Sequence, residues 1–549
     1  MGRVWGVDAL SKNASTSFYG NVVALAESEK RENLLAVGTD DGLIQISEDG
    51  GNSWRKIESF PGVPDRTYVS RVLFSRHDAN TIYATFDAHK NGDFKPYVLQ
   101  STDLGKSWTS IAGDLPEKGT VYALVQDKQK KDLLFAGTEF GVSFTLDGGK
   151  RWIKLEGGMP TIQVRDLAIQ EREGDLVAAT FGRGFYILDD YTPLRTFAEP
   201  ELEKEAALYP VKRAWAFVPW SPFGGREKGF NGDSFYNAPN PPEGAVFTYY
   251  LKDEIKTRQK TRQDAEREKE KKNEDTPYPT WDELRREDRE EKPAIVLTVT
   301  DEDGGVVRRV EGPAKAGFAR VAWDLRYPPS SPTTLTPPEL DPWESPPVGP
   351  LAAPGRYSVS LAKRVEGKLV PLAGPQSFEI APLGGDTLPA PDRTKLLAFQ
   401  QQTARLQRAV MGAARAIDEA QTRIDNLKVA LRDAPKADPK LQDDVRALEV
   451  RLKDLKTALS GDSTVARRNE PTPPSIYARV DQVVGGHWYS TADATATHHR
   501  NYEIAAKEFA PVLAGLRTLI LTDLTRLESA ADAAGAPWTP GRVPDWKPE

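Results

Sequence analysis

An internal repeat in the first third of the chain most strongly limits what this chain can fold into. The segment VVALAESEKRENLLAVGTDDGLIQISEDGGNSW at 22–54 returns as VYALVQDKQKKDLLFAGTEFGVSFTLDGGKRW at 121–152. A third copy occupies 70–108, and a fourth, at 164–190, keeps the early apolar segments but lacks the tryptophan. Each copy has short apolar segments separated by turn residues in a unit of about 40 to 50 residues, which is the size of a four-stranded propeller blade.

An eight-residue motif lies between the third and fourth predicted strands of the first three copies. Its defining residues are Ser47, Asp49, Gly51, Trp54, Ser101, Asp103, Gly105, Trp108, Thr145, Asp147, Gly149 and Trp152. In a hairpin turn the aspartate accepts backbone N–H bonds, the glycine permits positive φ, and the tryptophan buries its ring. A reaction needs one site, whereas a fold needs the same turn in every unit, so the motif is predicted to be structural.

The strand order predicts which side of the repeats carries function. In an antiparallel four-stranded unit the connections alternate between two faces, so the loops after the second and fourth strands share the face opposite the motif turns. Arg71 and Arg165 are expected at matching places in the innermost strands, where they either clamp an anionic ligand or pair with neighbouring acids. The other candidate ligand-binding residues of this face are Asp40, Asp41, Tyr68, Asp87, His89, Lys90, Glu139, Phe140 and Arg183.

Carboxylates on the same face are also the candidates for catalysis. Glycoside hydrolysis needs two of them about 5 to 9.5 Å apart, and nothing in the sequence selects a pair among Asp41, Asp87 and Glu139. No metal site is predicted, because the adjacent His498 and His499 would point about 100° apart on a helix. No cofactor is predicted either.

The rest of the chain predicts three further parts. Residues 199–243 form an aromatic and proline-rich connector, and 244–382 form a β-sandwich of the immunoglobulin or fibronectin type III kind, interrupted at 252–292 by a charged helical hairpin. Residues 383–549 carry apolar residues at helical spacing and predict an antiparallel helical bundle. With β-propeller blades at 1–198, the predicted fold class is mainly β with α. About four blades are expected, in an incomplete propeller, because the fourth copy lacks the motif and residues 1–19 offer little for a closing strand.

Composition excludes several classes of partner. The net charge of -7 gives no basic surface that would neutralise phosphates, so no nucleic acid is expected. The chain has no cysteine, which excludes disulfides and thiolate metal sites. The most apolar late run, VLAGLRTLIL, is short and interrupted by Arg517, so no membrane span is predicted, and the first residues show no apolar signal region.

The motif resembles the Asp-box of sialidase-like and sortilin-like propellers. Together with FGRGFYILDDYTPLR, AWDLRY and the heptad-patterned tail, the repeats resemble bacterial sortilin-like (VPS10-like) proteins, which are also described as BNR-repeat glycosyl hydrolases. This resemblance implies an exported, periplasmic or secreted protein, with Met1 at an internal position and the missing N-terminal half of the propeller as a partner. Because the hydrolase name rests mainly on the Asp-box, the resemblance transfers the fold and not the chemistry.

Two functional hypotheses follow. The first is a non-catalytic, extracytoplasmic binding protein whose propeller face engages a protein, peptide or glycan. The alternative is a glycoside hydrolase of the sialidase or xyloglucanase kind that acts on a polysaccharide. A shallow face of mixed charge with exposed aromatic side chains favours binding, whereas a carboxylate of raised pKa that faces a second one across a deep cleft favours the enzyme.

Overall fold

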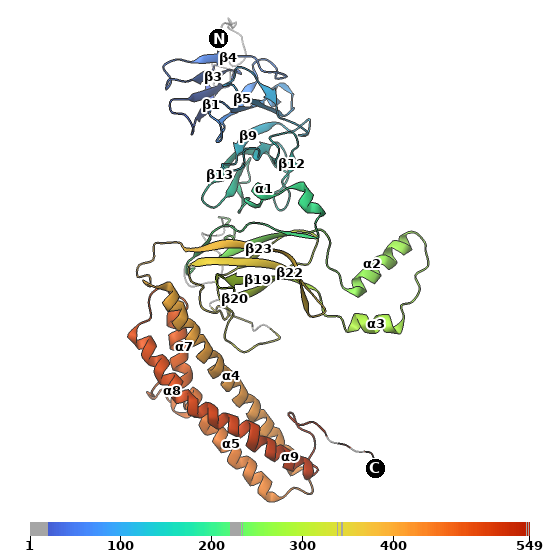
Figure 1. Cartoon of the computed structure of the whole chain (residues 1–549), viewed down its shortest axis with the longest axis vertical. Coiled ribbons are helices and arrows are strands. Elements are labelled where there is room, and N and C mark those ends of the chain that lie inside the picture. The colour runs from blue at the N-terminus through green and yellow to red at the C-terminus, as the bar shows by residue number, and fades with distance from the viewer. Residues whose placement is uncertain are drawn as a thin grey trace. The chain divides into compact units, whose positions relative to one another are not determined.

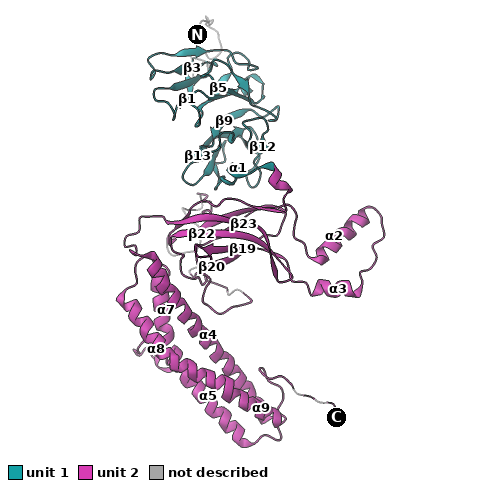
Figure 2. Ribbon diagram, viewed as in Figure 1, with its two compact units in different colours: residues 1–199 teal, residues 200–549 magenta. Residues whose placement is uncertain are grey.

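The chain divides into two compact units, residues 1–199 and 200–549, coloured separately in Figure 2. The computed structural model describes residues 20–219, 232, 234–336, 339–341, 344–544, 546 and 548. The expectation for residues 1–19 therefore lies outside the described residues, as do parts of the two proline-rich segments.

Unit 1 contains one antiparallel sheet from each repeat (Figure 1). The first three sheets have four strands and the last has three, and in every sheet neighbouring strands follow chain order, as they do in a propeller blade. Sheet 1 comprises β1 (Val22–Glu27), β2 (Leu35–Thr39), β3 (Ile44–Ser47) and β4 (Arg55–Ile57), and sheet 2 comprises β5 (Tyr68–Phe74), β6 (Ile82–Asp87), β7 (Tyr97–Ser101) and β8 (Thr109–Ser110). Sheet 3 comprises β9 (Val121–Gln126), β10 (Leu134–Thr138), β11 (Gly141–Thr145) and β12 (Ile153–Lys154), and sheet 4 comprises β13 (Val164–Gln170), β14 (Asp175–Thr180) and β15 (Phe185–Leu188). The short helices of unit 1 are η1 (His89–Asn91) and α1 (Pro193–Thr196), and η2 (Glu199–Glu203) begins at the last residue of unit 1.

The sheets of unit 1 pack face to face in chain order. Separate hydrophobic clusters join sheets 1 and 2, sheets 2 and 3, and sheets 3 and 4. The backbones approach closely at two glycines, because a Cβ on Gly38 would lie 2.4 Å from Val69 Cγ1 and one on Gly137 would lie 3.0 Å from Val164 Cγ1. A larger residue at either glycine would therefore push the sheets apart.

The motif aspartates bond within their own turns. Asp49 Oδ1 accepts bonds from the Ser47 hydroxyl at 2.8 Å and from the Ser53 backbone N–H at 2.9 Å. Asp103 and Asp147 accept the same two kinds of bond in sheets 2 and 3. All three carboxylates are thus used to hold the hairpin between the third and fourth strands.

The motif tryptophans differ from one another in burial. Trp108 and Trp152 are 8% and 7% exposed, but Trp54 is 39% exposed, so the expectation of a buried ring is wrong for the first copy. The physical reason is that each ring packs on the preceding sheet. The Trp108 ring lies 5.6 Å from the Phe60 ring, and Trp152 Nε1 donates to the Ile111 carbonyl at 2.9 Å. Among the described residues no sheet precedes sheet 1.

Unit 2 begins with two sheets that enclose one hydrophobic cluster around Phe247, Trp323 and Phe378. The three-stranded sheet is ordered β16 (Ala206–Leu208), β18 (Ala245–Leu251), β21 (Gly317–Trp323). The five-stranded sheet is ordered β17 (Ala214–Ala216), β23 (Lys368–Pro382), β22 (Gly355–Val365), β19 (Ala294–Asp301), β20 (Val306–Gly312). The β17–β23 pair is parallel, which the sequence did not indicate.

Two charged helices project from these sheets, α2 (Arg258–Lys271) and α3 (Trp281–Asp288) (Figure 1). Neither helix has a buried residue. They are joined instead by charge, because the Arg262 guanidinium donates two bonds to the Glu287 carboxylate at 2.7 and 2.8 Å. A side-chain cap begins each helix, from Thr257 in α2 and from Thr280 in α3.

The C-terminal part of unit 2 is helical. Apolar residues of the first helix are buried at Leu396, Phe399, Ile417 and Ile424. Ile417 and Ile424 belong to a hydrophobic cluster that the following helices share. A helix within 476–487 was not predicted. The helices are α4 (Arg393–Arg432), α5 (Pro439–Ser460), α6 (Ser463–Ala466), α7 (Ile476–His487), α8 (Ala496–Thr518), the π-helix η4 (Leu519–Leu524) and α9 (Thr525–Ala533).

Within the described residues, the helices are all too short or too polar to span a membrane. The predicted domain boundaries at 198/199, 243/244 and 382/383 stay predictions.

Candidate ligand-binding site

The connections that follow the second strand of each sheet carry the candidate site. They comprise residues 40–43, 88–96, 139–140 and 181–184. Each of the last three contains an exposed phenylalanine: Phe94 is 44% exposed, Phe140 43% and Phe181 71%. Exposed aromatic rings in successive loops are typical of a surface that contacts a ligand.

A carboxylate–histidine pair follows strand β6. Asp87 Oδ1 accepts the backbone N–H of His89 at 3.0 Å and lies 2.5 Å from His89 Nδ1. The Asp87 side chain is 7% exposed and the His89 side chain 34%. The buried carboxylate therefore holds the imidazole ring at the surface with its Nδ1 engaged, and leaves Nε2 as the ring nitrogen that a ligand can contact.

A second polar group joins sheet 3 to sheet 4. The Tyr122 hydroxyl lies 2.5 Å from Glu139 Oε2, and Gln163 Nε2 donates to the Tyr122 oxygen at 2.7 Å and to Glu139 Oε2 at 2.8 Å. Burial raises the pKa of Tyr122, and the charges of Glu139 and Asp87 raise it further. Tyr122 thus stays neutral as a donor, and the Glu139 carboxylate is fixed by two side chains.

The two groups are linked by rings and charges. The His89 and Tyr122 ring centroids lie 6.3 Å apart, edge to face, and the Arg165 guanidinium carbon lies 4.3 Å from the Tyr122 ring centroid. Burial raises the pKa of Tyr68. The charges of Asp40 and Asp87 raise this pKa further, and the charge of Arg165 lowers it. The structure therefore brings residues from all four sheets together at one end of the innermost strands.

The expectation that Arg71 and Arg165 match in position is wrong. Arg71 pairs in the ladder with Thr85, and its counterpart in sheet 4 is Asp166, which pairs with Ala179. Arg165 instead lies in the β-bulge between Val164 and Asp166. Sheet 2 has the same one-residue bulge between Val69 and Arg71, so Arg71 is the residue after the bulge, Arg165 is the bulged residue, and the two arginines are not equivalent. Arg71 forms an ion pair with Asp166, while Arg165 packs over Tyr122.

The remaining predicted residues lie at the margins of this group. Asp40 accepts bonds from the backbone and side-chain N–H groups of Asn21 at 2.9 and 3.0 Å, and Asp41 Oδ1 lies 2.5 Å from the Thr39 hydroxyl. Lys90 and Arg183 are exposed. Asp41, Asp87 and Glu139, the three candidate catalytic carboxylates, all accept hydrogen bonds from their own surroundings.

Sequence reasoning missed Tyr122, Gln163 and Asp166. Tyr122 and Gln163 lie in or next to innermost strands, where an apolar pattern predicts burial and gives no sign of a polar partner. Their one available signal was position, because Tyr122 and Gln163 are next to Val121 and Val164, two valines that recur at equivalent places in the repeat. Within the described part of the chain, no group of three or more His, Cys, Asp or Glu residues could hold a metal ion.

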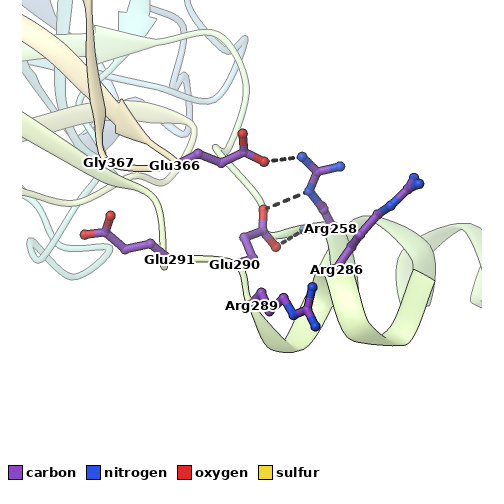
Figure 3. Close-up of a pocket in the computed structure, with 7 residues that line it drawn as sticks. All are labelled: Arg258, Arg286, Arg289, Glu290, Glu291, Glu366 and Gly367. Carbon is purple, nitrogen blue, oxygen red and sulfur yellow. Dashed lines mark hydrogen bonds and ion pairs between the residues drawn. The ribbon is translucent and has the colours of Figure 1, made fainter. Parts of the chain in front are cut away.

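A separate pocket of about 460 Å³ lies where the charged helices meet the β22–β23 turn (Figure 3). The Arg258 guanidinium contacts Glu366, and the backbone N–H of Arg258 donates to Glu290 Oε2 at 2.7 Å. Glu291 pairs with Arg364 at 3.2 Å. The acids of this pocket are thus engaged by arginines, and these contacts join the segment with the two charged helices to β22 and to the β22–β23 turn.

Comparisons with known proteins give partial matches to solved structures at low TM-scores. No protein-family model matches the sequence, and no curated protein matches it. YCF48 bound to D1 peptide is similar with a TM-score of 0.26 and 18% identity over 32% of this chain. A GH74 enzyme of Niastella koreensis has a TM-score of 0.25 and 14% identity over 43% of this chain, and the Cps50 (Swd1) β-propeller domain of Myceliophteria thermophila has 0.25 and 16% over 33%. The matches cover 52%, 29% and 54% of those chains, so this chain spans about half of the length of two of them and less of the third.

Proposed function

We propose that this protein is a non-catalytic binding protein whose loop face, defined by residues 40–43, 88–96, 139–140 and 181–184, engages a protein, peptide or glycan ligand. The observation that carries the proposal is the combination of Phe94, Phe140 and Phe181, all exposed, with the fixed polar group around Tyr122. The rings supply apolar contact area, and His89 and Arg165 supply hydrogen bonds and positive charge. An extracytoplasmic location is part of this proposal and rests on the sortilin-like resemblance alone.

Binding is tested by screening the full chain against a displayed peptide library and a glycan array. For a ligand found in either screen, Phe140→Ser and Phe181→Ser are each expected to weaken affinity about tenfold or more, as loss of an interface ring does. Val306→Ser is the matched control, because Val306 is a 51% exposed apolar residue of unit 2. Equal binding by all three variants would contradict the proposed face.

The hydrolase alternative is tested with the carboxylates. If the protein only binds, Asp41→Asn, Asp87→Asn and Glu139→Gln leave any weak cleavage of xyloglucan or sialosides by a purified sample unchanged. Loss of a catalytic acid or nucleophile lowers a rate by several orders of magnitude. Such a loss in one or two of the variants, with the remaining variant unaffected, would show that the face is an active site.

A further inference from the structure

Two apolar sheet surfaces are exposed at the two ends of unit 1. In sheet 1, Val22 is 59% exposed and Leu25 is 69% exposed. In sheet 4, Phe185 is 74% exposed and Ile187 is 58% exposed. Large apolar side chains that are exposed next to one another in a strand mark a surface that a partner covers.

The exposed residues of sheet 1 occupy positions that are buried in the other sheets. We call these positions the leading face, because they contact the preceding sheet. Their counterparts in the first strands of the other sheets are all buried. The counterparts of Val22 are Val69 (0% exposed), Val121 (0%) and Val164 (0%), and those of Leu25 are Val72 (2%), Leu124 (1%) and Leu167 (5%). Sheet 1 therefore presents a complete leading face with nothing described against it.

The exposed residues of sheet 4 occupy a second set of equivalent positions, the trailing face, which contacts the following sheet. Strand register defines it, because Ala36 pairs with Ile46, Phe135 with Phe144, and Val177 with Ile187. The next ladder position pairs Gly38 with Ile44, Gly137 with Val142, and Ala179 with Phe185. In sheets 1 and 3 the large side chains at these positions are buried, in contrast to Phe185 and Ile187 of sheet 4. The exposed fractions are 0% for Ala36, 0% for Ile44, 2% for Ile46, 0% for Phe135, 1% for Val142 and 8% for Phe144.

The two faces approach closely in two of the three contacts between successive sheets, and in the contact between sheets 2 and 3 the equivalent trailing-face position is Thr85. Val69 of a leading face lies over Gly38 of the trailing face before it, and Val164 lies over Gly137 in the same way. Sheet 4 has a small residue, Ala179, at the position of these glycines, flanked by Phe185 and Ile187. The exposed trailing face of sheet 4 thus has a small residue between large apolar side chains, as the covered trailing faces of sheets 1 and 3 do. Val22 is the exposed counterpart of Val69 and Val164.

We propose that a second copy of this chain covers these surfaces, with the leading face of sheet 1 in one copy packed on the trailing face of sheet 4 in the other. The argument is continuity with an interface that the chain already forms between its own successive sheets. One chain carries both halves of the contact, and the contact is head to tail, so it is heterologous and leads to closed rings or longer arrays. Trp54, exposed in sheet 1 alone among the three motif tryptophans, adds to the surface that is covered.

The test uses the full chain and its mass in solution, measured by light scattering after size-exclusion chromatography over a wide range of concentration. The wild-type chain is expected to form dimers or larger assemblies. Leu25→Glu and Ile187→Glu each destroy one face, so each variant alone is expected to be monomeric. An equimolar mixture of the two variants still offers one intact face of each kind and is expected to form a heterodimer and nothing larger.

Two results would overturn the proposal. One is a wild-type chain that stays monomeric at every concentration, which would mean that another molecule covers these faces. The other is a Leu25→Glu variant that still assembles while Ile187→Glu does not, which would mean that two trailing faces pair with each other. Val306→Glu, at an exposed apolar position of unit 2, is the control and leaves assembly unchanged. Circular dichroism and limited proteolysis establish that each variant is folded, which is expected because every substituted side chain is mostly exposed.

Discussion

Single hydroxyl groups distinguish the three motif aspartates. Asp49 Oδ2 accepts the Ser53 hydroxyl at 2.6 Å, and Asp103 Oδ2 accepts the Ser107 hydroxyl at 2.6 Å. The equivalent residue beside Asp147 is Arg151, whose backbone N–H donates to the carboxylate. The Ser53 hydroxyl is the largest of the hydrogen-bond effects that lower the pKa of Asp49 to about 2.

Ser53→Ala is therefore expected to raise the pKa of Asp49 toward its ordinary value of 3.8. The stabilising effect of ionised Asp49 on its turn is present above that ordinary value and is lost as the pH falls through about 2 in the wild type, and at a higher pH in the variant. Carboxyl-carbon NMR titration measures this shift. Arg151→Ala is the matched control, because the bond to Asp147 comes from the backbone and survives the substitution. An unchanged Asp49 pKa in Ser53→Ala would show that the hydroxyl is not responsible.

At the scale of elements, a buried histidine lies where α4, α7 and α8 meet. His487 is 2% exposed, and its ring centroid lies 5.5 Å from the Phe399 ring and 4.5 Å from the His498 ring. Neither ring nitrogen has a hydrogen-bond partner among the described residues. The pKa of His487 is lowered to about 4, chiefly by burial and also by the charges of His498 and His499, while Asp493 opposes the shift.

The helical part of unit 2 is accordingly expected to lose stability as the pH falls from 6.5 to 4. The unfolded chain binds a proton on His487 in this window and the folded chain does not, so the free energy of unfolding decreases with decreasing pH, by on the order of 3 kcal/mol across the window. Urea unfolding followed by far-ultraviolet circular dichroism at several pH values measures it.

His487→Phe keeps the ring contacts and removes the titrating group, so the stability of its helical part is expected to depend less on pH than that of the wild type. His77→Gln, in unit 1, is the control and leaves the pH dependence of the helices unchanged. If His487→Phe and wild type lose stability in parallel between these pH values, another group is responsible.

Element patterns could be predicted from the sequence, and side-chain partners could not. The strands within 244–382 and the helices within 383–549 were predicted from their apolar patterns, and β18 and α4 lie in those two ranges. Helix α7 was missed because it is short and contains Gly485 and Gly486 in its last turn, and glycine disfavours a helix.

Partners were missed because they are far apart in the chain. The Tyr122–Glu139 contact joins residues 17 positions apart, and Asp127 is bonded by Tyr191 and Arg195, 64 and 68 positions away. Periodicity tells which face a residue is on, and not which residue of another element lies opposite. The loop positions of the candidate site were therefore predictable, but the hydrogen-bonded group at its centre was not.

At the scale of the whole molecule, each compact unit has hydrophobic clusters of its own. Those of unit 1 lie between successive sheets, whereas unit 2 has one cluster in its sheets and one in its helices. Because apolar burial is a local stabilising effect, a cavity made in one cluster is expected to destabilise that cluster first.

Ile424→Ala tests this expectation. Ile424 is fully buried in α4, and removal of its side chain is expected to lower the stability of the helical part by about 3 kcal/mol. Hydrogen exchange followed by mass spectrometry on the full chain would show faster exchange in α4, α5 and α8, with β9, β10 and β11 of unit 1 unchanged. Val429→Ala, on the same helix but 50% exposed, is the matched control and is expected to change stability by less than about 0.5 kcal/mol. Faster exchange in the unit 1 strands of Ile424→Ala would mean that both units unfold as one cooperative body, because a local cavity would then be felt throughout the chain.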